Sequence, residues 1–257
     1  MHNPSVAVVF FGHLRTYKSC IHSIKENIVE PLNASVYIHS WDELESNTTT
    51  WHTEKTKNRK VDSKDINLLN EVLAPKALVI ESQAEYLRSN QRDVDSNHLG
   101  IKSMFYSKAS AIKLAEGYDI VITIRPDIYV GYKMSYLDIT QKGLIVFYNT
   151  SNNNNDLKSV RAVDIVNISS WKTLNNLGEF FLNNFNAFVV PRLSKSGGEM
   201  LSDYCELVGL NYKLSKFKYG NNWFIFRSGI KSRITKLKML AKKYVFEEYI
   251  VPICFKN

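Results

Sequence analysis

The chain has 257 residues, of which 44% are hydrophobic and 23% charged, and its formal net charge is +8. This length can bury one sizeable core, and a composition so close to the globular average argues against a disordered or membrane-embedded protein. The positive charge attracts polyanions, a class that includes nucleotide diphosphates and anionic lipid headgroups as well as nucleic acid, so charge alone does not identify a partner.

The cysteines and the N-terminal residues indicate the cellular compartment in which the protein is expected. Cys20, Cys205 and Cys254 lie far apart, form no CxxC pair and are odd in number, which is typical of free thiols in a reducing compartment. The chain runs from Pro4 directly into an apolar segment, without the basic region of a signal peptide. No apolar run reaches the roughly 18 residues that a membrane-spanning helix needs. We therefore expect a cytoplasmic protein whose membrane contact is at most peripheral.

Short apolar runs alternate with helical patterns through the first half of the chain. The runs are continuous, which favours strands covered on both faces, as in parallel sheets. They occupy residues 6–11, 35–39, 77–80, 120–124 and 144–148. Apolar residues at helical spacing predict helices over 17–32 and 102–116. Strands that alternate with helices predict an α/β fold, with a mostly parallel Rossmann-type central sheet flanked by helices.

Polarity and residue spacing predict the structure of the remaining segments. Residues 43–65 are polar and predict a surface excursion, and the asparagine-rich residues 151–156 predict a loop. The second half then predicts helices over 171–185 and 199–210 and one or two strands over 212–227. We find no internal repeat and expect a single domain.

The tail from 227 to 243 is a basic segment with apolar residues at helical spacing. It carries Lys and Arg residues interleaved with Ile234, Leu237, Leu240 and Ala241. A basic amphipathic helix can lie on an anionic membrane surface. The alternative is a helix that packs on the domain by its apolar stripe, and the sequence does not choose between the two.

Gly12, His13 and Arg15 follow the first predicted strand and precede a predicted helix. In open α/β sheets the ligand crevice lies at the carboxyl ends of the strands, where glycine allows close approach of the backbone and a helix N-terminus attracts phosphate. The guanidinium of Arg15 can make a bidentate contact with a diphosphate. These residues are candidates for binding a phosphate-containing donor substrate.

Two further groups of candidates stand at element ends. Trp41 and Asp42 end the second predicted strand, where they can stack on a base and hydrogen-bond a ribose, although Trp41 can equally fill the core. Lys102 and Ser103 stand near the start of the helix that precedes the central strand, where they can meet an anionic ligand.

Arg125 and Asp127 give the sharpest signal, because a strongly apolar strand ends in Arg-Pro-Asp. Proline halts ladder pairing, which places Asp127 at the carboxyl end of the strand. A carboxylate there can hold Mn²⁺ or Mg²⁺ between the phosphates of a nucleotide sugar, and the ion stabilises the departing diphosphate. Arg125 can supply part of the same charge. The alternative is a surface Arg–Asp pair.

Asp164 and Glu199 are candidates for a catalytic base or a further ligand. Glu199 stands where a helix is predicted to begin, so its alternative role is to stabilise the helix N-terminus.

Four motifs in this order carry a resemblance to a known family. They are Gly-x-x-Arg at 12–15, Ile-His-x-Trp-Asp at 38–42, Ser-Met-Phe-Tyr at 103–106 and Arg-Pro-Asp at 125–127. Over residues 6–130 the chain resembles the bacterial polysaccharide-biosynthesis glycosyltransferases, and the rest matches only loosely. In the Asp-x-Asp metal motif of GT-A enzymes, Arg125 replaces the first carboxylate. Asp164 is the counterpart of the aspartate in an Asp-Gln-Phe segment of the family.

The resemblance implies a GT-A-like fold, a nucleotide-sugar donor and an acceptor glycan of lipopolysaccharide, O-antigen or capsule, either lipid-linked or within lipopolysaccharide. Residues 1–150 are then expected to bind the donor, 151–226 to form the acceptor side and 227–257 to form a basic C-terminal helix or tail. If this tail lies on an anionic membrane surface, the protein associates with the cytoplasmic face of the inner membrane. The alternatives are transfer of another group, which lacks a phosphate-binding loop motif here, or a non-catalytic glycan-binding protein. No helix-turn-helix, zinc-ligand or RNA-binding pattern supports a nucleic-acid partner.

Overall fold

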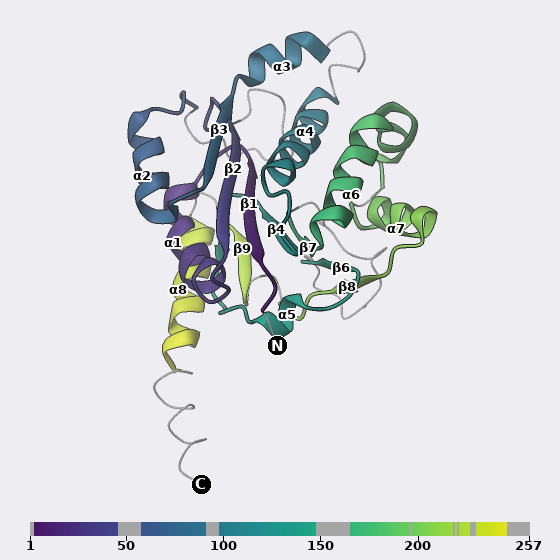
Figure 1. The fold of residues 1–257 in the computed structure, drawn as a ribbon. Coiled ribbons are helices and arrows are strands. Elements are labelled where there is room, and N and C mark those ends of the chain that lie inside the picture. Colours follow the sequence, from purple (N-terminus) through teal and green to yellow (C-terminus); the bar gives the residue numbers. More distant parts are fainter. Residues whose placement is uncertain are drawn as a thin grey trace.

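The computed structural model describes residues 3–45, 58–90, 98–147, 165–195, 197–217, 219, 221–226 and 230–245. Seven strands form one sheet in the order β3-β2-β1-β4-β7-β6-β8 (Figure 1). Its parallel part consists of β1 (Val6–Gly12), β2 (Ser35–Trp41), β3 (Ala77–Glu81) and β4 (Ile120–Ile124). The α/β class and the mostly parallel sheet are therefore confirmed.

The other strands extend or adjoin this sheet. They are β6 (Leu144–Val146), β7 (Val166–Ser169), β8 (Tyr212–Leu214) and a separate antiparallel pair, β5 (Ile128–Val130) and β9 (Trp223–Ile225). β7 pairs antiparallel with both β4 and β6. β6 also pairs parallel with β8, so β7 is the strand that runs antiparallel to its neighbours within an otherwise parallel sheet.

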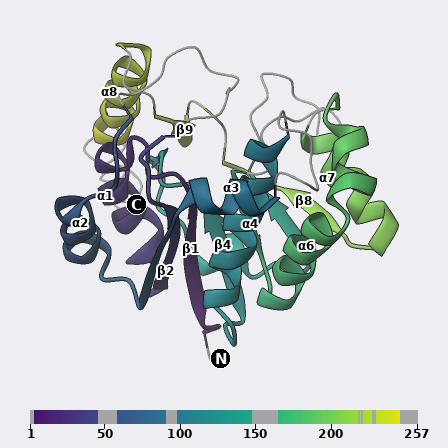
Figure 2. The same cartoon turned by 90° about the horizontal axis from the view of Figure 1, so that it is seen from above.

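Helices cover both faces of the sheet (Figure 2). On one side lie α4 (Leu99–Leu114), α6 (Trp171–Asn183) and α7 (Gly197–Val208). On the other lie α1 (Ile21–Ile24), α2 (Ser63–Leu73) and α8 (Ile230–Val245). Shorter helical elements are η1 (Tyr17–Ser19), η2 (Lys25–Val29), α3 (Gln83–Asn90), α5 (Tyr136–Ile139), η4 (Phe185–Val189) and η5 (Val190–Arg192).

β1 shows how the sequence pattern builds both cores. Val8 and Phe10 belong to the core on the α1 and α2 side, whereas Val9 and Phe11 belong to the core on the α4 and α6 side. Successive side chains of a strand point to opposite faces, so a strand between two helical layers is apolar at every position. This explains the continuous run at residues 6–11.

The predicted surface excursion over 43–65 is wrong at its C-terminal end. α2 begins at Ser63, and Asp62 and Asp65 form a reciprocal capping box at its start. Asp65 is buried, where it accepts hydrogen bonds from Arg59 and Tyr17. Two donors at its carboxylate allow a charged residue from a polar segment to enter the core. Residues 46–57 lie outside the described part of the chain.

The strand order also decides where a ligand can bind. The chain moves outward from β1 through β2 to β3 and then returns to place β4 on the other side of β1. The carboxyl ends of β1 and β4 therefore flank the point at which the order reverses, where open α/β sheets bind their ligands.

The sequence also predicts free thiols and no membrane-spanning helix, and the structure bears on both predictions. Cys20 and Cys205 are buried and form no disulfide within the described residues, and Cys254 lies outside them. None of the helices in the described ranges combines the length and apolar composition that crossing a bilayer requires.

Candidate functional site

Two arginines converge on one buried carboxylate where β1 and β4 end. The side chain of Asp127 is 0% exposed. Its Oδ1 accepts from Nε of Arg125 at 3.0 Å, and its Oδ2 accepts from NH2 of Arg125 at 2.6 Å. NH1 of Arg15 lies 3.4 Å from the same Oδ2. The structure thus brings together Arg15, Arg125 and Asp127. The alternative from the sequence was a surface pair of Arg125 and Asp127, but the side chains are only 15% and 0% exposed.

Local backbone geometry places Arg15 in this cluster. Gly12 has a φ of +84° and Arg15 a φ of +50°, both in the left-handed region that turns the chain sharply after β1. The backbone N–H of Arg15 donates to the carbonyl of Leu44 at 2.8 Å. Nε of Arg15 lies 2.9 Å from Oε1 of Glu45. A carboxylate on each side therefore holds the guanidinium in place.

Ser107 ties the ends of β1 and β2 together, a role that sequence reasoning missed. Its buried Oγ accepts from the backbone N–H of Gly12 at 2.7 Å and lies 2.8 Å from Nδ1 of His39. Burial lowers the pKa of His39. The four-residue spacing between Ser103 and Ser107 was an available signal, because residues four apart share a helix face.

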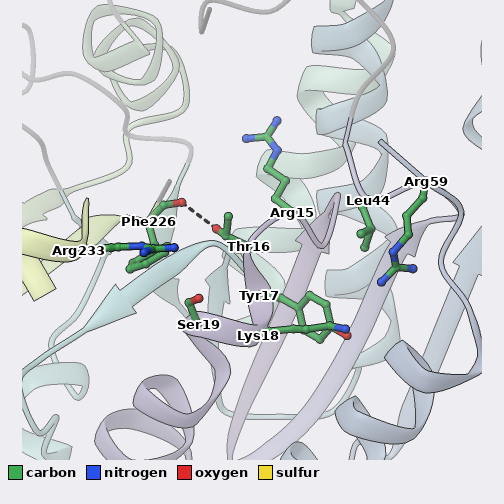
Figure 3. A pocket seen from close by; sticks show the side chains of 9 residues that line it. All are labelled: Arg15, Thr16, Tyr17, Lys18, Ser19, Leu44, Arg59, Phe226 and Arg233. Carbon is green, nitrogen blue, oxygen red and sulfur yellow. Dashed lines mark hydrogen bonds between the residues drawn. The ribbon is translucent and has the colours of Figure 1, made fainter. Parts of the chain in front are cut away.

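A cavity of about 340 Å³ adjoins Arg15, and its wall is strongly basic. Figure 3 shows the side chains around it, with Thr16 donating to the carbonyl of Phe226. The basic residues that line the cavity are Arg15, Lys18, Arg59 and Arg233. Four cationic side chains around one cavity favour binding of an anion with several charges.

Asp65 fixes two of these cations. Arg59 contacts it through NH1 at 2.5 Å and NH2 at 2.8 Å, and Nζ of Lys18 lies 3.1 Å away. Burial by itself would raise the pKa of Asp65, but the hydrogen bonds from Arg59 and Tyr17 hold it well below its usual value. Arg233 forms no ion pair with any residue in the described ranges and is exposed. Sequence reasoning missed Lys18, Arg59 and Glu45, because an isolated surface charge carries no periodic signal.

In this structure guanidinium groups contact the carboxylate of Asp127, where the sequence predicts a divalent cation. Both oxygens of this carboxylate already accept guanidinium hydrogen bonds. Within the described ranges, no group of three or more His, Cys, Asp or Glu side chains is placed to hold a metal ion, whereas Mg²⁺ and similar hard cations prefer several oxygen ligands. The cation therefore stays a prediction from the sequence.

Trp41 and Asp42 make contacts within the protein. Trp41 is 1% exposed, and its ring lies 5.8 Å from that of Tyr106 and 5.4 Å from that of Tyr86. Asp42 accepts from Nζ of Lys60 at 2.5 Å. The sequence allowed Trp41 either to stack on a base or to fill the core, and its burial favours the core role.

The other predicted residues are spread over the fold. Ser103 is buried and accepts from Gln83 at 3.0 Å, whereas Lys102 is partly exposed in the first turns of α4. Glu199 is partly exposed in the first turn of α7, and in both views α7 lies beyond α4 and α6 from β1 (Figures 1 and 2). Asp164 lies outside the described residues.

His13 is a buried histidine beside the arginine cluster. Its Nδ1 lies 2.9 Å from the carbonyl oxygen of Glu43, which favours the tautomer with the proton on Nδ1. Nε2 is buried and has no hydrogen-bond partner among the residues that the structure describes. Burial lowers the pKa of His13 from its ordinary value near 6.5 to about 4. The imidazole is therefore neutral at physiological pH, with an acceptor nitrogen ready for a donor group.

We expect the protein to lose stability as the pH falls from 7 to 5, in part through His13. The folded state resists protonation that the unfolded state accepts below about pH 6.5, so His13 accounts for about 2 kcal/mol of this loss at pH 5. Urea unfolding at several pH values measures it, and His13→Asn should flatten the profile. The pKa of His39 is also lowered, so this residue adds to the loss of stability in both proteins. The contribution of His13 is therefore the difference between the slopes of unfolding free energy against pH for the wild type and His13→Asn.

The control is the same substitution at exposed His22, which removes an imidazole without opening a buried site. Equal slopes for the wild type and His13→Asn would contradict the buried, neutral state of His13.

No protein-family model matches the chain, and no curated protein matches its sequence. The function is therefore inferred from the geometry of the site and from the sequence motifs.

Proposed function

We propose that the chain is a nucleotide-sugar-dependent glycosyltransferase that adds a sugar to a glycan of a bacterial surface polysaccharide. One observation carries the proposal: Arg15 and Arg125 converge on Asp127 where the strand order reverses, beside a basic cavity. This geometry suits a diphosphate, because guanidinium groups pair with phosphate oxygens in a bidentate manner. The GT-A-like assignment and the acceptor class rest on the sequence motifs.

In the proposed reaction the arginines stabilise the leaving group. The bond between the anomeric carbon and the diphosphate oxygen breaks, a bond from that carbon to the acceptor hydroxyl oxygen forms, and the acceptor proton passes to a base. Negative charge grows on the departing nucleoside diphosphate as the bond breaks. Positively charged groups already held in position stabilise that charge without reorganising. Asp127 positions Arg125 and Arg15 for this role, and Asp164 and Glu199 stay predictions for the base.

The proposal assigns the cavity to the donor's phosphates. Its basic residues come from three separate segments: Arg15 and Lys18 after β1, Arg59 before α2 and Arg233 on α8. Cationic side chains from distant segments around one cavity attract a polyanion. A nucleoside diphosphate carries such charge, and its sugar would extend from the phosphates toward the carboxyl end of β4.

Thermal unfolding with UDP-, GDP-, CMP- and dTDP-linked sugars tests the proposal. We expect one nucleotide class to stabilise the protein by roughly 2.7 kcal/mol at about 100 times its Kd. Arg233→Ala should weaken this stabilisation, because Arg233 lines the cavity without an ion pair that its removal would break in the described part of the chain. Arg15→Lys should weaken it as well, since lysine keeps the charge but loses the bidentate contact.

The matched control is Arg88→Ala, which removes an exposed arginine of α3 outside the cavity. Repeating the titration with EDTA separates the arginine contribution from that of a cation, and we expect the stabilisation to persist. Release of nucleoside diphosphate in the presence of an acceptor glycan then reports transfer. No response to any nucleotide sugar would overturn the proposal and favour transfer of another group or glycan binding without catalysis.

A further inference from the structure

We propose that the outward face of α8 docks the protein on an anionic phospholipid bilayer. The helix lies at the edge of the molecule beside α1 in both views (Figures 1 and 2). This inference is independent of the proposed function, because it concerns a surface and not the site at the ends of β1 and β4.

The inward face of α8 is held by a small set of contacts. Met239 is buried with Cys20, Tyr129, Phe224 and Phe226. Nζ of Lys236 donates to the carbonyl of Ser19 at 3.3 Å and lies 5.1 Å from the ring centre of Tyr129. The apolar stripe that the sequence highlights is therefore not the face that packs on the domain.

The stripe faces away from the protein instead. Ile234 is 46% exposed, Leu237 65% and Leu240 43%. These residues are spaced three apart and so share one side of the helix. Lys238 is exposed beside them. An apolar stripe with cations beside it suits the boundary between lipid headgroups and acyl chains.

Charge selects the occupant of this face. The sequence of α8, IKSRITKLKMLAKKYV, contains six Lys or Arg residues and no Asp or Glu. A second copy of the helix would bring equally positive surfaces together, which costs free energy. An anionic bilayer offers acyl chains for the stripe and phosphate for the cations, each basic residue contributing about fivefold in affinity. The surface therefore fits a lipid membrane better than a second copy of the chain.

Cosedimentation with vesicles tests the proposal. The full chain is mixed with vesicles of phosphatidylcholine alone or of phosphatidylcholine with phosphatidylglycerol. We expect binding to the mixed vesicles, little binding to the neutral ones, and weaker binding as salt screens the charges. Leu237→Asp should weaken binding roughly tenfold or more, since it removes apolar area from the lipid contact and adds a repelled charge. Lys238→Glu should weaken it about fivefold or more.

Each variant has a matched control elsewhere on the surface. Leu207 on α7 is 63% exposed, so Leu207→Asp makes the same change at similar exposure. Lys172 is exposed on α6 and serves as Lys172→Glu.

The proposal would be overturned by equal binding to both kinds of vesicle, by absence of binding, or by equal loss in Leu207→Asp and Leu237→Asp. A dimer in solution that Leu237→Asp dissociates would assign the face to a second copy and would also overturn it. The vesicle experiment contains no nucleotide sugar, so a failure to bind vesicles would not contradict the proposed glycosyltransferase function. Likewise, a failure to respond to nucleotide sugars would not contradict membrane docking.

Discussion

Replacing Asp127 by alanine is expected to lower the free energy of unfolding by about 3–5 kcal/mol, because it breaks a buried ion pair from one side. Both oxygens of Asp127 accept from Arg125, and Arg15 approaches the second. Without the carboxylate, two guanidinium groups remain close together without the charge that holds them. Chemical denaturation followed by circular dichroism measures the change.

Two variants show whether burial causes the effect. Asp127→Asn keeps an acceptor oxygen and the side-chain shape, so its loss should be smaller than that of the alanine variant. Asp203→Ala also removes a carboxylate that pairs with two cations, Arg192 and Lys195, but this cluster is partly exposed. We expect it to cost about 1 kcal/mol or less. Equal losses for Asp127→Ala and Asp203→Ala would contradict the buried cluster.

Trp41→Ala should also cost about 3–5 kcal/mol, the usual range for deleting a large buried side chain. The indole is 1% exposed and packs against the rings of His39, Tyr86 and Tyr106. Its removal would leave a cavity between β2 and α4 and would loosen the strand end next to Gly12. The same denaturation measurement gives the change.

Trp41→Phe separates core packing from ligand stacking. Phenylalanine fills much of the space, so the stability loss should be smaller, and stabilisation by a nucleotide sugar should stay as in the wild type. Tyr132→Ala is the surface control, because Tyr132 is partly exposed, and we expect about 1 kcal/mol or less. A nearly stable Trp41→Ala protein that no longer responds to nucleotide sugars would contradict the core assignment.

Much of the site follows from where residues stand along the chain. Gly12 ends β1 and Arg15 follows it, while Arg125 and Asp127 follow β4, so parallel pairing of these strands brings them to one edge of the sheet. The ion pairs between them could not be predicted, because they depend on the left-handed backbone at Arg15 and on the depth at which the chain turns. The partners Glu45 and Arg59 come from a polar segment whose position no pattern specifies.

The basic tail shows the same limit. Spacing of apolar residues predicts a helix, and α8 covers Ile230–Val245. Spacing does not say which side of the helix meets the protein. Met239 packs inward and Leu237 outward, because the surface formed by Tyr129 and Phe226 accepts one side of the helix, and this surface exists only in the folded chain.

The sequence by itself determined the α/β class, the main strands and helices, and the strand ends that carry Arg15, Arg125 and Asp127. It could do so because burial on both faces makes a strand apolar at every position, and because helices repeat every 3.6 residues. Only the tertiary structure decided the antiparallel direction of β7, the burial of Trp41, the basic cavity and the outward face of α8. Each of these depends on contacts between residues far apart in the chain, and local patterns carry no information about such contacts.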